Sequence, residues 1–147
     1  MINTHFDEQS ADQRALSASL ILHRAKYEAI KTHSPVFLTG DFNSPARDEA
    51  YQIVTGAKAP KPLNQAFLDR YHWTAAESAG FENFTMQDLL GEVEPRYRIG
   101  GNFATFTDFL PLGNTTEFQR IDYIMAGSNG NWCVSSFLSL IPGRTLL

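Results

Sequence analysis

The stretch from Val36 to Ala50 reads VFLTGDFNSPARDEA and changes character within a few residues. Largely apolar residues lead into Gly-Asp-Phe-Asn, and then Ser-Pro, acidic residues and more apolar residues follow. The segment VFLTG is too short for a helix and has the apolar density of a buried strand. The sequence therefore predicts a strand that ends by presenting Asp41 and Asn43. These two side chains are either turn formers or part of the edge of a catalytic site.

Helix signals flank this strand on both sides. Ser10 and Gln13 match an S-x-x-Q capping box, and the helix that they begin is expected to end near His33. After the strand, Ser44 is the predicted N-cap of a second helix, Pro45 its first residue and Gly56 the residue just past its end. Four apolar side chains of the first helix are spaced to share one face: Leu16, Leu20, Tyr27 and Ile30.

Further strands are predicted on both sides of these helices. Residues 1–6 resemble the end of a strand, and Arg120–Gly127 (RIDYIMAG) reads as another. FATFTDF (Phe103–Phe109) and NWCVSSFL (residues 131–138) are additional candidates, whereas residues 57–102 show no clear pattern. The order strand, helix, strand, helix and then strands predicts a mixed α/β architecture.

Length and composition fit one soluble globular domain. The chain has 147 residues, 43% of them hydrophobic, and its 12 basic and 16 acidic residues give a net charge of −4. This charge does not favour binding to long nucleic acid, which depends on neutralising phosphates. No apolar run reaches membrane-spanning length and no signal peptide is visible, so a cytoplasmic location is expected, or secretion if an N-terminal part is missing.

Three short stretches place polar side chains at the end of a strand or inside one: Asn3–His5 (NTH), Gly40–Asn43 (GDFN) and Arg120–Ile124 (RIDYI). Taken singly, His5 reads as an exposed or hydrogen-bonded side chain, and Asp41 and Asn43 as turn residues. Asp122 is harder to explain because it interrupts an apolar run. An aspartate there must pair with a base such as Arg120 or reach the mouth of a site.

Hydrolysis of a phosphate ester gives these residue types a reason to occur together. The reaction needs an activated water, donors for the phosphoryl oxygens and stabilisation of the leaving oxygen. A carboxylate such as Asp41 can deprotonate the water, and an amide such as Asn43 can donate to a phosphate oxygen. A protonated histidine such as His5 can bind the developing negative charge, and Asp122 can hold a histidine in the required tautomer.

The sequences NTHFD, GDFNSPARDEAY, ATFTDF and RIDYIM follow one another as in the endonuclease/exonuclease/phosphatase superfamily, which the chain resembles from residue 2 to about 138. GDFN followed by IDYI is the specific part of this resemblance. It implies a DNase I-like four-layer α/β/β/α sandwich, present here as a partial, C-terminal portion with a mixed sheet flanked by helices. Residues 1–138 then form this part of the domain, and residues 139–147 form a divergent tail.

The resemblance also implies roles for individual residues. Asp41 corresponds to the water-activating aspartate, Asn43 to the phosphate-contacting asparagine and His5 to the histidine that binds the scissile phosphate. Asp122 corresponds to the aspartate that pairs with a late catalytic histidine. Asn3 and Thr105 are expected near the substrate. The implied cofactor is Mg²⁺, with Mn²⁺ as a substitute, and Asp41 is its candidate ligand.

The sequence departs from the family pattern in two places. The metal-binding glutamate of the family lies upstream of NTH, and its late SDH motif has no counterpart after RIDYI. The remaining ligands are expected to bind Mg²⁺ poorly. We therefore expect a truncated domain, a chain that needs a missing half, or one that needs a partner chain.

Three functions remain open from the sequence. The first is a metal-dependent phosphoesterase acting on a phosphodiester or phosphomonoester, impaired or inactive as this isolated chain. The second is a non-catalytic interaction or regulatory module that keeps half of the fold. The third is an unrelated α/β binding protein, which would be favoured if Asp41 and Asp122 lay more than about 12 Å apart, several hydrogen-bond lengths.

Overall fold

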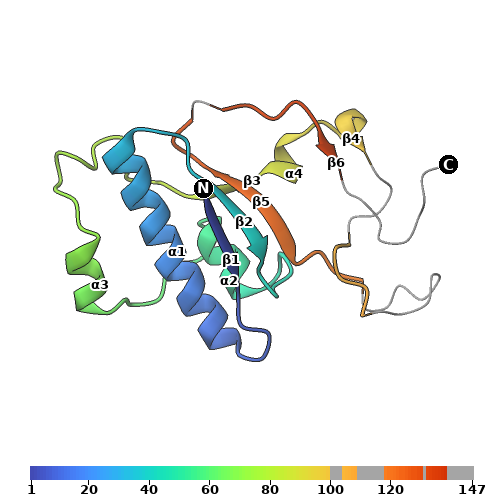
Figure 1. Ribbon diagram of the computed structural model, residues 1–147, viewed down its shortest axis with the longest axis horizontal. Helices are drawn as coiled ribbons and strands as arrows, with labels where there is room; N and C mark the ends of the chain where they lie inside the picture. Colours follow the sequence, from blue (N-terminus) through green and yellow to red (C-terminus); the bar gives the residue numbers. More distant parts are fainter. Residues whose placement is uncertain (100–103, 109–117, 131, 139–147) are drawn as a thin grey trace.

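In the computed structural model, helices pack against one face of a four-stranded mixed sheet (Figure 1). The structure describes residues 1–99, 104–108, 118–130 and 132–138. The elements in chain order are β1 (Ile2–His5), α1 (Ala11–Thr32), β2 (Phe37–Asp41), α2 (Glu49–Val54), α3 (Gln65–Arg70), β3 (Met86–Asp88), α4 (Leu89–Glu92), the 3₁₀ helix η1 (Pro95–Tyr97), β4 (Arg98–Ile99), β5 (Asp122–Gly127) and β6 (Phe137–Leu138).

The strand order of the main sheet is β1-β2-β5-β3. β1 runs parallel to β2, whereas β5 is antiparallel to both β2 and β3. β4 and β6 form a separate parallel pair. The mixed sheet flanked by helices that the sequence predicts is confirmed, with β1, β2 and β5 at the three expected places.

Helix α1 has the ends that the sequence predicts. The Ser10 hydroxyl oxygen accepts a hydrogen bond from the backbone N–H of Gln13 at 3.3 Å, and His33 ends the helix in the left-handed region at φ 51°. The capping box is completed differently, because the backbone N–H of Ser10 donates to Asp7 Oδ1 at 2.6 Å. Asp7 thus accepts the hydrogen bond from the Ser10 N–H that a capping box assigns to the side chain of Gln13.

The buried face of α1 differs from the predicted stripe. Of the four apolar residues expected there, only Ile30 is buried, and Leu16, Leu20 and Tyr27 are half-buried. Small side chains occupy most of the buried face because they let the helix approach its neighbours closely, while the larger ones pack at the rim. The buried residues are Ala15, Ala18, Ser19, Leu22, Ala25, Ala29 and Ile30.

The prediction that α2 begins at Ser44 is wrong. Asp48 is the N-cap and Glu49 the first helical residue, and the N–H of Asp48 closes a turn on the Pro45 carbonyl at 2.9 Å. The Ser44 carbonyl accepts instead from the Tyr123 hydroxyl at 3.0 Å, which ties the chain to β5 before a helix can start. Gly56 follows the helix at φ 81°, as the sequence predicts.

The late strand candidates are shorter than the sequence suggests. Of Phe103–Phe109, the described residues 104–108 make one isolated bridge between Phe106 and Gln119 and no strand. Of NWCVSSFL, only Phe137–Leu138 is a strand among the described residues. The predicted tail at 139–147 lies outside the described residues. In the described part of the chain, no helix is both long enough and apolar enough to cross a membrane.

Candidate functional site

Three predicted site residues lie in one row at an edge of the sheet. β1 ends at His5, β2 ends at Asp41 and β5 begins at Asp122, and the register pairs His5 with Asp41 and Asp41 with Asp122. Neighbouring strands lie about 4.8 Å apart, so the row spans about 10 Å. A large separation of Asp41 and Asp122 would have favoured the third reading of the sequence, whereas the two residues are direct cross-strand partners.

Strand alternation turns the row away from the helices. Leu38 and Tyr123 point into the core that α1 and α2 cover, and both are buried. Their neighbours in the alternating pattern, His5, Asp41 and Asp122, therefore point to the opposite face. Each of the three is partly or largely exposed to solvent.

Gly40 explains how β1 and β2 come so close beside this row. Its φ is +142°, and a Cβ atom at this position would lie 1.9 Å from the carbonyl oxygen of Thr4. Only a residue without a side chain permits this backbone conformation and this approach. The glycine of the GDFN motif thus positions the strand ends, and Asp41 follows it directly.

His5 and Asp41 face each other across the strand ends. His5 Nε2 lies 3.7 Å from Asp41 Oδ2, which is too long for a hydrogen bond but suits an ion pair when the imidazole is protonated. The His5 side chain is 74% exposed and that of Asp41 31% exposed, so both are open to a ligand. The other carboxylate oxygen, Asp41 Oδ1, accepts from the backbone N–H of Asn43 at 2.7 Å.

Asn43 ties the two strand ends together. It adopts the left-handed conformation at φ 46°, which asparagine tolerates better than most residues. Its Nδ2 donates to the carbonyl oxygen of Phe6, just beyond His5, at 2.8 Å. The amide nitrogen carries two hydrogens, so one N–H is left to contact a ligand.

Thr105 and Asn3 border the row on two sides. The Thr105 hydroxyl oxygen accepts from the backbone N–H groups of Ile121 and Asp122, both at 3.1 Å. It therefore holds the start of β5, and its own hydrogen remains able to donate. Asn3 lies two residues before His5 on the same face, and its Oδ1 accepts from the Thr39 hydroxyl at 3.0 Å.

The Asp122 carboxylate is exposed and has no hydrogen bond or ion pair with any described residue. The alternative that Asp122 pairs with Arg120 is wrong. Arg120 forms a two-pronged ion pair with Asp88 at the end of β3, and its guanidinium lies 4.5 Å from the Tyr123 ring centroid. Among the described residues, Asp122 thus remains free to act on a ligand or on another side chain.

The pair of Arg120 and Asp88 belongs to a mostly buried network that could not be detected from the sequence. The two side chains are 15% and 12% exposed, and the Tyr51 hydroxyl donates to Asp88 Oδ2 at 3.0 Å. Burial, helped by the negative charge of Asp88, raises the pKa of Tyr51 to about 12. Burial also raises the pKa of Tyr123. The network fixes β3, β5 and α2 around the site.

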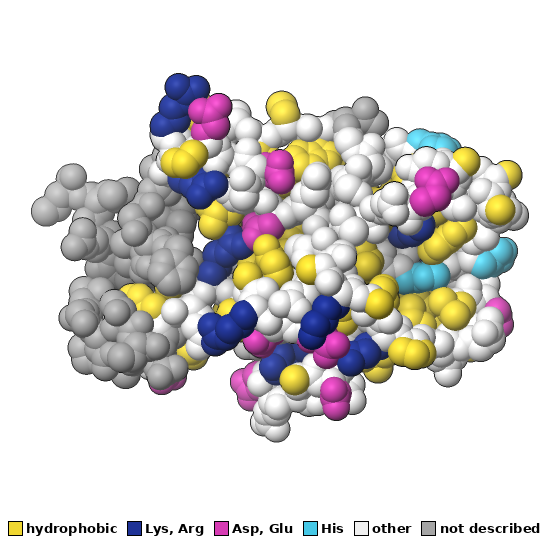
Figure 2. Space-filling view, turned by 180° about the vertical axis from the view of Figure 1, so that it is seen from behind, with side chains coloured by type: hydrophobic (Ala, Val, Ile, Leu, Met, Phe, Trp, Pro, Cys, Tyr) yellow, Lys and Arg dark blue, Asp and Glu magenta, His cyan; other side chains and the backbone are white. Residues whose placement is uncertain are grey.

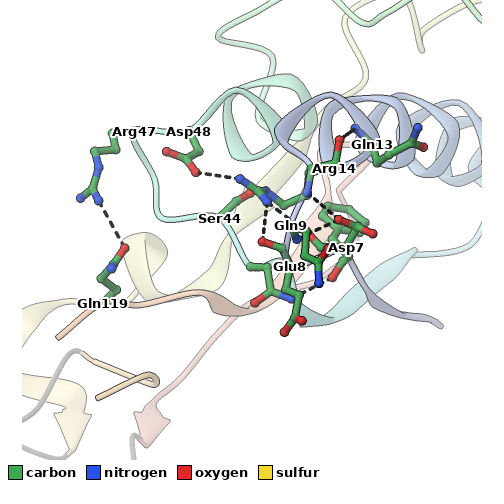
Figure 3. Close-up of polar contacts among 12 residues, drawn as sticks. Asp7, Glu8, Gln9, Gln13, Arg14, Ser44, Arg47, Asp48 and Gln119 are labelled. Carbon is green, nitrogen blue, oxygen red and sulfur yellow. Dashed lines mark hydrogen bonds and ion pairs between the residues drawn. The ribbon is translucent and has the colours of Figure 1, made fainter. Parts of the chain in front are cut away.

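Arg14 connects the two loops that follow β1 and β2 (Figure 3). Its Nη1 donates to the carbonyl oxygens of Asp7 and Glu8 at 3.2 and 3.1 Å, and its Nη2 lies 3.8 Å from Asp48 Oδ2. The Arg14 side chain is only 13% exposed. This mostly buried guanidinium therefore holds the loop after His5 against the loop after Asn43.

The remaining histidines lie away from the row. His23 is on α1, where its Nε2 contacts the Tyr71 carbonyl oxygen at 2.7 Å, and His33 caps the same helix. His72 follows α3 and contacts the Asp69 carbonyl oxygen at 2.7 Å. None of them can serve as the histidine partner that the resemblance implies for Asp122.

The described residues supply at most part of a Mg²⁺ site. Magnesium prefers six oxygen ligands in a near-octahedral arrangement. Within residues 1–99, 104–108, 118–130 and 132–138, no group of three or more His, Cys, Asp or Glu residues is placed to hold a metal ion. Asp41 and Asp122 are two carboxylates in the row, and no third acidic side chain joins them.

Solved structures show which fold this is. Over 84% of the chain, it matches an endonuclease/exonuclease/phosphatase from Bacteroides vulgatus at 24% identity with a TM-score of 0.53. The fold is that of endonuclease/exonuclease/phosphatase proteins. A mannosyl-6-phosphatase from Bacteroides thetaiotaomicron matches this fold over 86% of the chain, at 25% identity and a TM-score of 0.54.

A conserved protein of unknown function from Enterococcus faecalis matches over 94% of the chain at 26% identity, with a TM-score of 0.54. The chain spans 36 to 40% of the length of these three structures. No protein-family model matches the sequence, and no curated protein is significantly similar to it. The likeness to endonuclease/exonuclease/phosphatase proteins therefore rests on structure and on short motifs.

Proposed function

We propose that this chain provides the phosphate-binding and water-activating part of a phosphoesterase site. The observation that carries the proposal is the row formed by His5, Asp41 and Asp122, with Asn43 beside it. These side chains come from three strands and share one exposed edge. The likeness to phosphatase and nuclease-like proteins supports the same reaction class.

In the proposed reaction, Asp41 accepts a proton from a water molecule. The water oxygen forms a bond to phosphorus, and the bond from phosphorus to the ester oxygen breaks. Protonated His5 and the free N–H of Asn43 bind the phosphoryl oxygens as negative charge increases there. Asp122 orients a ligand group or another side chain at the same edge. The leaving oxygen takes up a proton from solvent.

Mg²⁺, or Mn²⁺ in its place, belongs to the proposal only for the complete domain. The described residues supply at most two carboxylates for it, Asp41 and Asp122, and no step above depends on the metal. The experiment must therefore include the metal as a variable. One structural neighbour is a mannosyl-6-phosphatase, and a sugar monophosphate is for this reason a useful second substrate.

The test is hydrolysis of p-nitrophenyl phosphate, bis(p-nitrophenyl) phosphate and mannose 6-phosphate by the purified chain, with Mg²⁺ and with EDTA. We expect Asp41→Ala to lower any activity at least about 100-fold, the usual contribution of a general base. Asp12→Ala, an exposed aspartate on α1, is the matched control and should retain activity. Activity that survives Asp41→Ala would refute the assigned role.

A binding measurement separates the two leading functions. The imidazole resonances of His5 are followed by NMR while inorganic phosphate is added. A saturable shift that Asp41→Ala or Asn43→Ala alters, without hydrolysis, would favour the non-catalytic module, which keeps the phosphate contacts but not the chemistry. If the chain neither hydrolyses a substrate nor shows a shift of the His5 resonances, the proposal is wrong for this chain.

A further inference from the structure

A pocket lies away from the row at the strand ends. It has a volume of about 580 Å³ and lies between α1, the loop after α2 and the segment that leads into β3. Small-molecule sites usually have volumes of about 300 to 1,000 Å³. β3 pairs with the far end of β5, where Met86 faces Gly127, about 17 Å along the strand from Asp122. The pocket is therefore distinct from the proposed phosphoesterase site.

One side of the pocket is apolar and carries a fixed aromatic ring. Leu22 and Phe84 are buried, and Trp73 stacks on His23 with ring centroids 4.6 Å apart and an interplanar angle of 30°. His23 is itself held by the carbonyl oxygen of Tyr71 at 2.7 Å. The Trp73 ring is thus a preformed surface on which a planar group can pack.

The pocket is also lined by two cations that lack a full set of partners. Lys26 Nζ lies 5.5 Å from the Trp73 ring centroid, and its one hydrogen bond within the described residues is a long contact of 3.4 Å to the Glu82 carbonyl oxygen. An ammonium group has three donors. The side chain of Lys58 makes no hydrogen bond or ion pair with any described residue.

The environment of Lys26 favours an added negative charge. Burial lowers the pKa of its ammonium group, and the opposing effect of Glu82 is smaller. The ammonium is therefore partly desolvated, and Glu82 compensates only part of this effect. Figure 2 shows hydrophobic side chains and histidines gathered with a lysine or arginine on the side of the molecule where α3 lies.

We propose that this pocket binds a small molecule that combines one planar ring with one anionic group, a carboxylate or a phosphate. The ring packs on Trp73 between the apolar walls formed by Leu22 and Phe84. The anion is bound by Lys26 and Lys58. Neutral and cationic ring compounds lack this charge pairing and bind less well.

Trp73 itself reports binding. The chain has two tryptophans, so Trp132→Phe leaves Trp73 as the only fluorophore of this kind. In this background, benzoate and phenyl phosphate are titrated up to about 10 mM, and benzamide is the neutral control of matched shape. We expect a saturable change of Trp73 emission with either anion and a much weaker one with benzamide. A response to phenyl phosphate alone would assign the site to phosphates.

Substitutions on α1 identify the cation that binds the ligand. Lys26→Gln should raise the dissociation constant about tenfold, the typical effect of losing one charge-assisted contact. Lys31→Gln is the matched control, because Lys31 lies on the same helix outside the pocket and pairs with Glu77, and it should leave affinity unchanged. Because Lys58 is exposed, Lys58→Gln serves as a second variant if Lys26→Gln does not fold.

Three results would overturn the proposal. The first is a Trp73 response to benzamide equal to the response to the anions, and the second is an unchanged affinity for the anions in both Lys26→Gln and Lys58→Gln. The third is the lack of a saturable response to either anion. Asp41→Ala should retain binding of benzoate to this pocket. Because benzoate carries no phosphate ester bond, its binding does not depend on whether the strand-end row hydrolyses phosphate esters.

Discussion

At the scale of single residues, Asp41 and Asp122 are cross-strand partners with like charges. Asp41 has only His5 nearby at 3.7 Å, and Asp122 has no cation beside it among the described residues. Like charges directly opposite each other on neighbouring strands destabilise a sheet. We therefore expect Asp122→Asn to raise the free energy of unfolding by about 0.2 to 1 kcal/mol, measured by urea denaturation near neutral pH.

Asp12→Asn is the control for this change, because Asp12 is exposed on α1 and has no like-charged partner across a strand. A loss of stability in Asp122→Asn would contradict the expectation and show that the carboxylate is engaged by another group. A gain would mean that the row costs stability in the folded chain. Such a cost is common where side chains are placed for binding or catalysis rather than for stability.

At the scale of the elements, the sequence predicts strand ends better than packing. Apolar runs and capping signals are local, and they correctly locate β1, α1, β2 and β5. Which face of α1 is buried depends on how closely its neighbours approach. The alanines of α1 occupy most of the buried face, whereas Leu16 and Leu20 are not among its buried residues. The start of α2 depends on the hydrogen bond from the Tyr123 hydroxyl to the Ser44 carbonyl oxygen, and these residues are far apart in the sequence.

Gly40 is the point where the pairing of β1 and β2 can be tested. Gly40→Ala would place a Cβ atom 1.9 Å from the Thr4 carbonyl oxygen and would force a residue with a side chain to φ +142°. We expect a loss of at least about 2 kcal/mol in the free energy of unfolding, from overpacking and backbone strain together. Thermal and urea denaturation measure this loss.

Gly91→Ala is the matched control for Gly40→Ala. Gly91 lies in α4, and a Cβ atom there would meet no atom within 4 Å. Alanine is a better helix former than glycine, so this variant should be neutral or more stable by up to about 1 kcal/mol. Equal stability of the two variants would mean that β1 is not held against Gly40 as described.

Arg14 links the loop after β1 to the loop after β2, and its removal should loosen both loops. Arg14→Gln loses the bonds to the carbonyl oxygens of Asp7 and Glu8 and the contact to Asp48. Hydrogen bonds to a charged group contribute about 1.5 to 3 kcal/mol, and we expect a loss of stability of this order. Hydrogen exchange should rise in residues 6–10 and in residues 42–48 together.

Arg47→Gln is the control for Arg14→Gln. Arg47 is exposed, and its side chain donates a single hydrogen bond of 3.3 Å within the described residues, to Gln119 Oε1 (Figure 3). Its loss should change stability by no more than about 0.5 kcal/mol. Faster exchange in only one of the two loops of Arg14→Gln would show that the loops are held independently, and the bridging role would be wrong.

At the scale of the whole molecule, the site is assembled by topology rather than by neighbouring residues in the sequence. Short motifs identify His5, Asp41 and Asp122 as candidates, but only the strand order β1-β2-β5 brings them into one row. Asp88, the partner of Arg120, could not be predicted because it lies in a stretch without a clear pattern. The row faces the side of the sheet opposite α1 and α2, where Ile124 is 46% exposed.

The network of Tyr51, Asp88 and Arg120 gives the whole molecule a defined response to alkaline pH. Tyrosine ordinarily loses its proton near pH 10, whereas burial raises the pKa of Tyr51 to about 12 in the folded chain. The unfolded chain therefore releases this proton first as the pH rises. The stability that the protonated phenol contributes is complete below about pH 10 and is lost as the pH approaches about 12.

We expect a loss of about 1 to 2 kcal/mol from Tyr51 across this window, less than the full two-unit difference because part of the ring faces solvent. Urea denaturation at about pH 9 and about pH 12 measures it, and absorbance of the phenolate follows the titration. Tyr51→Phe should make the loss smaller, while Tyr97→Phe, an exposed tyrosine, should leave it unchanged. An identical alkaline loss in the parent chain and in Tyr51→Phe would place the titrating group elsewhere, with Tyr123 the next candidate because burial raises its pKa as well.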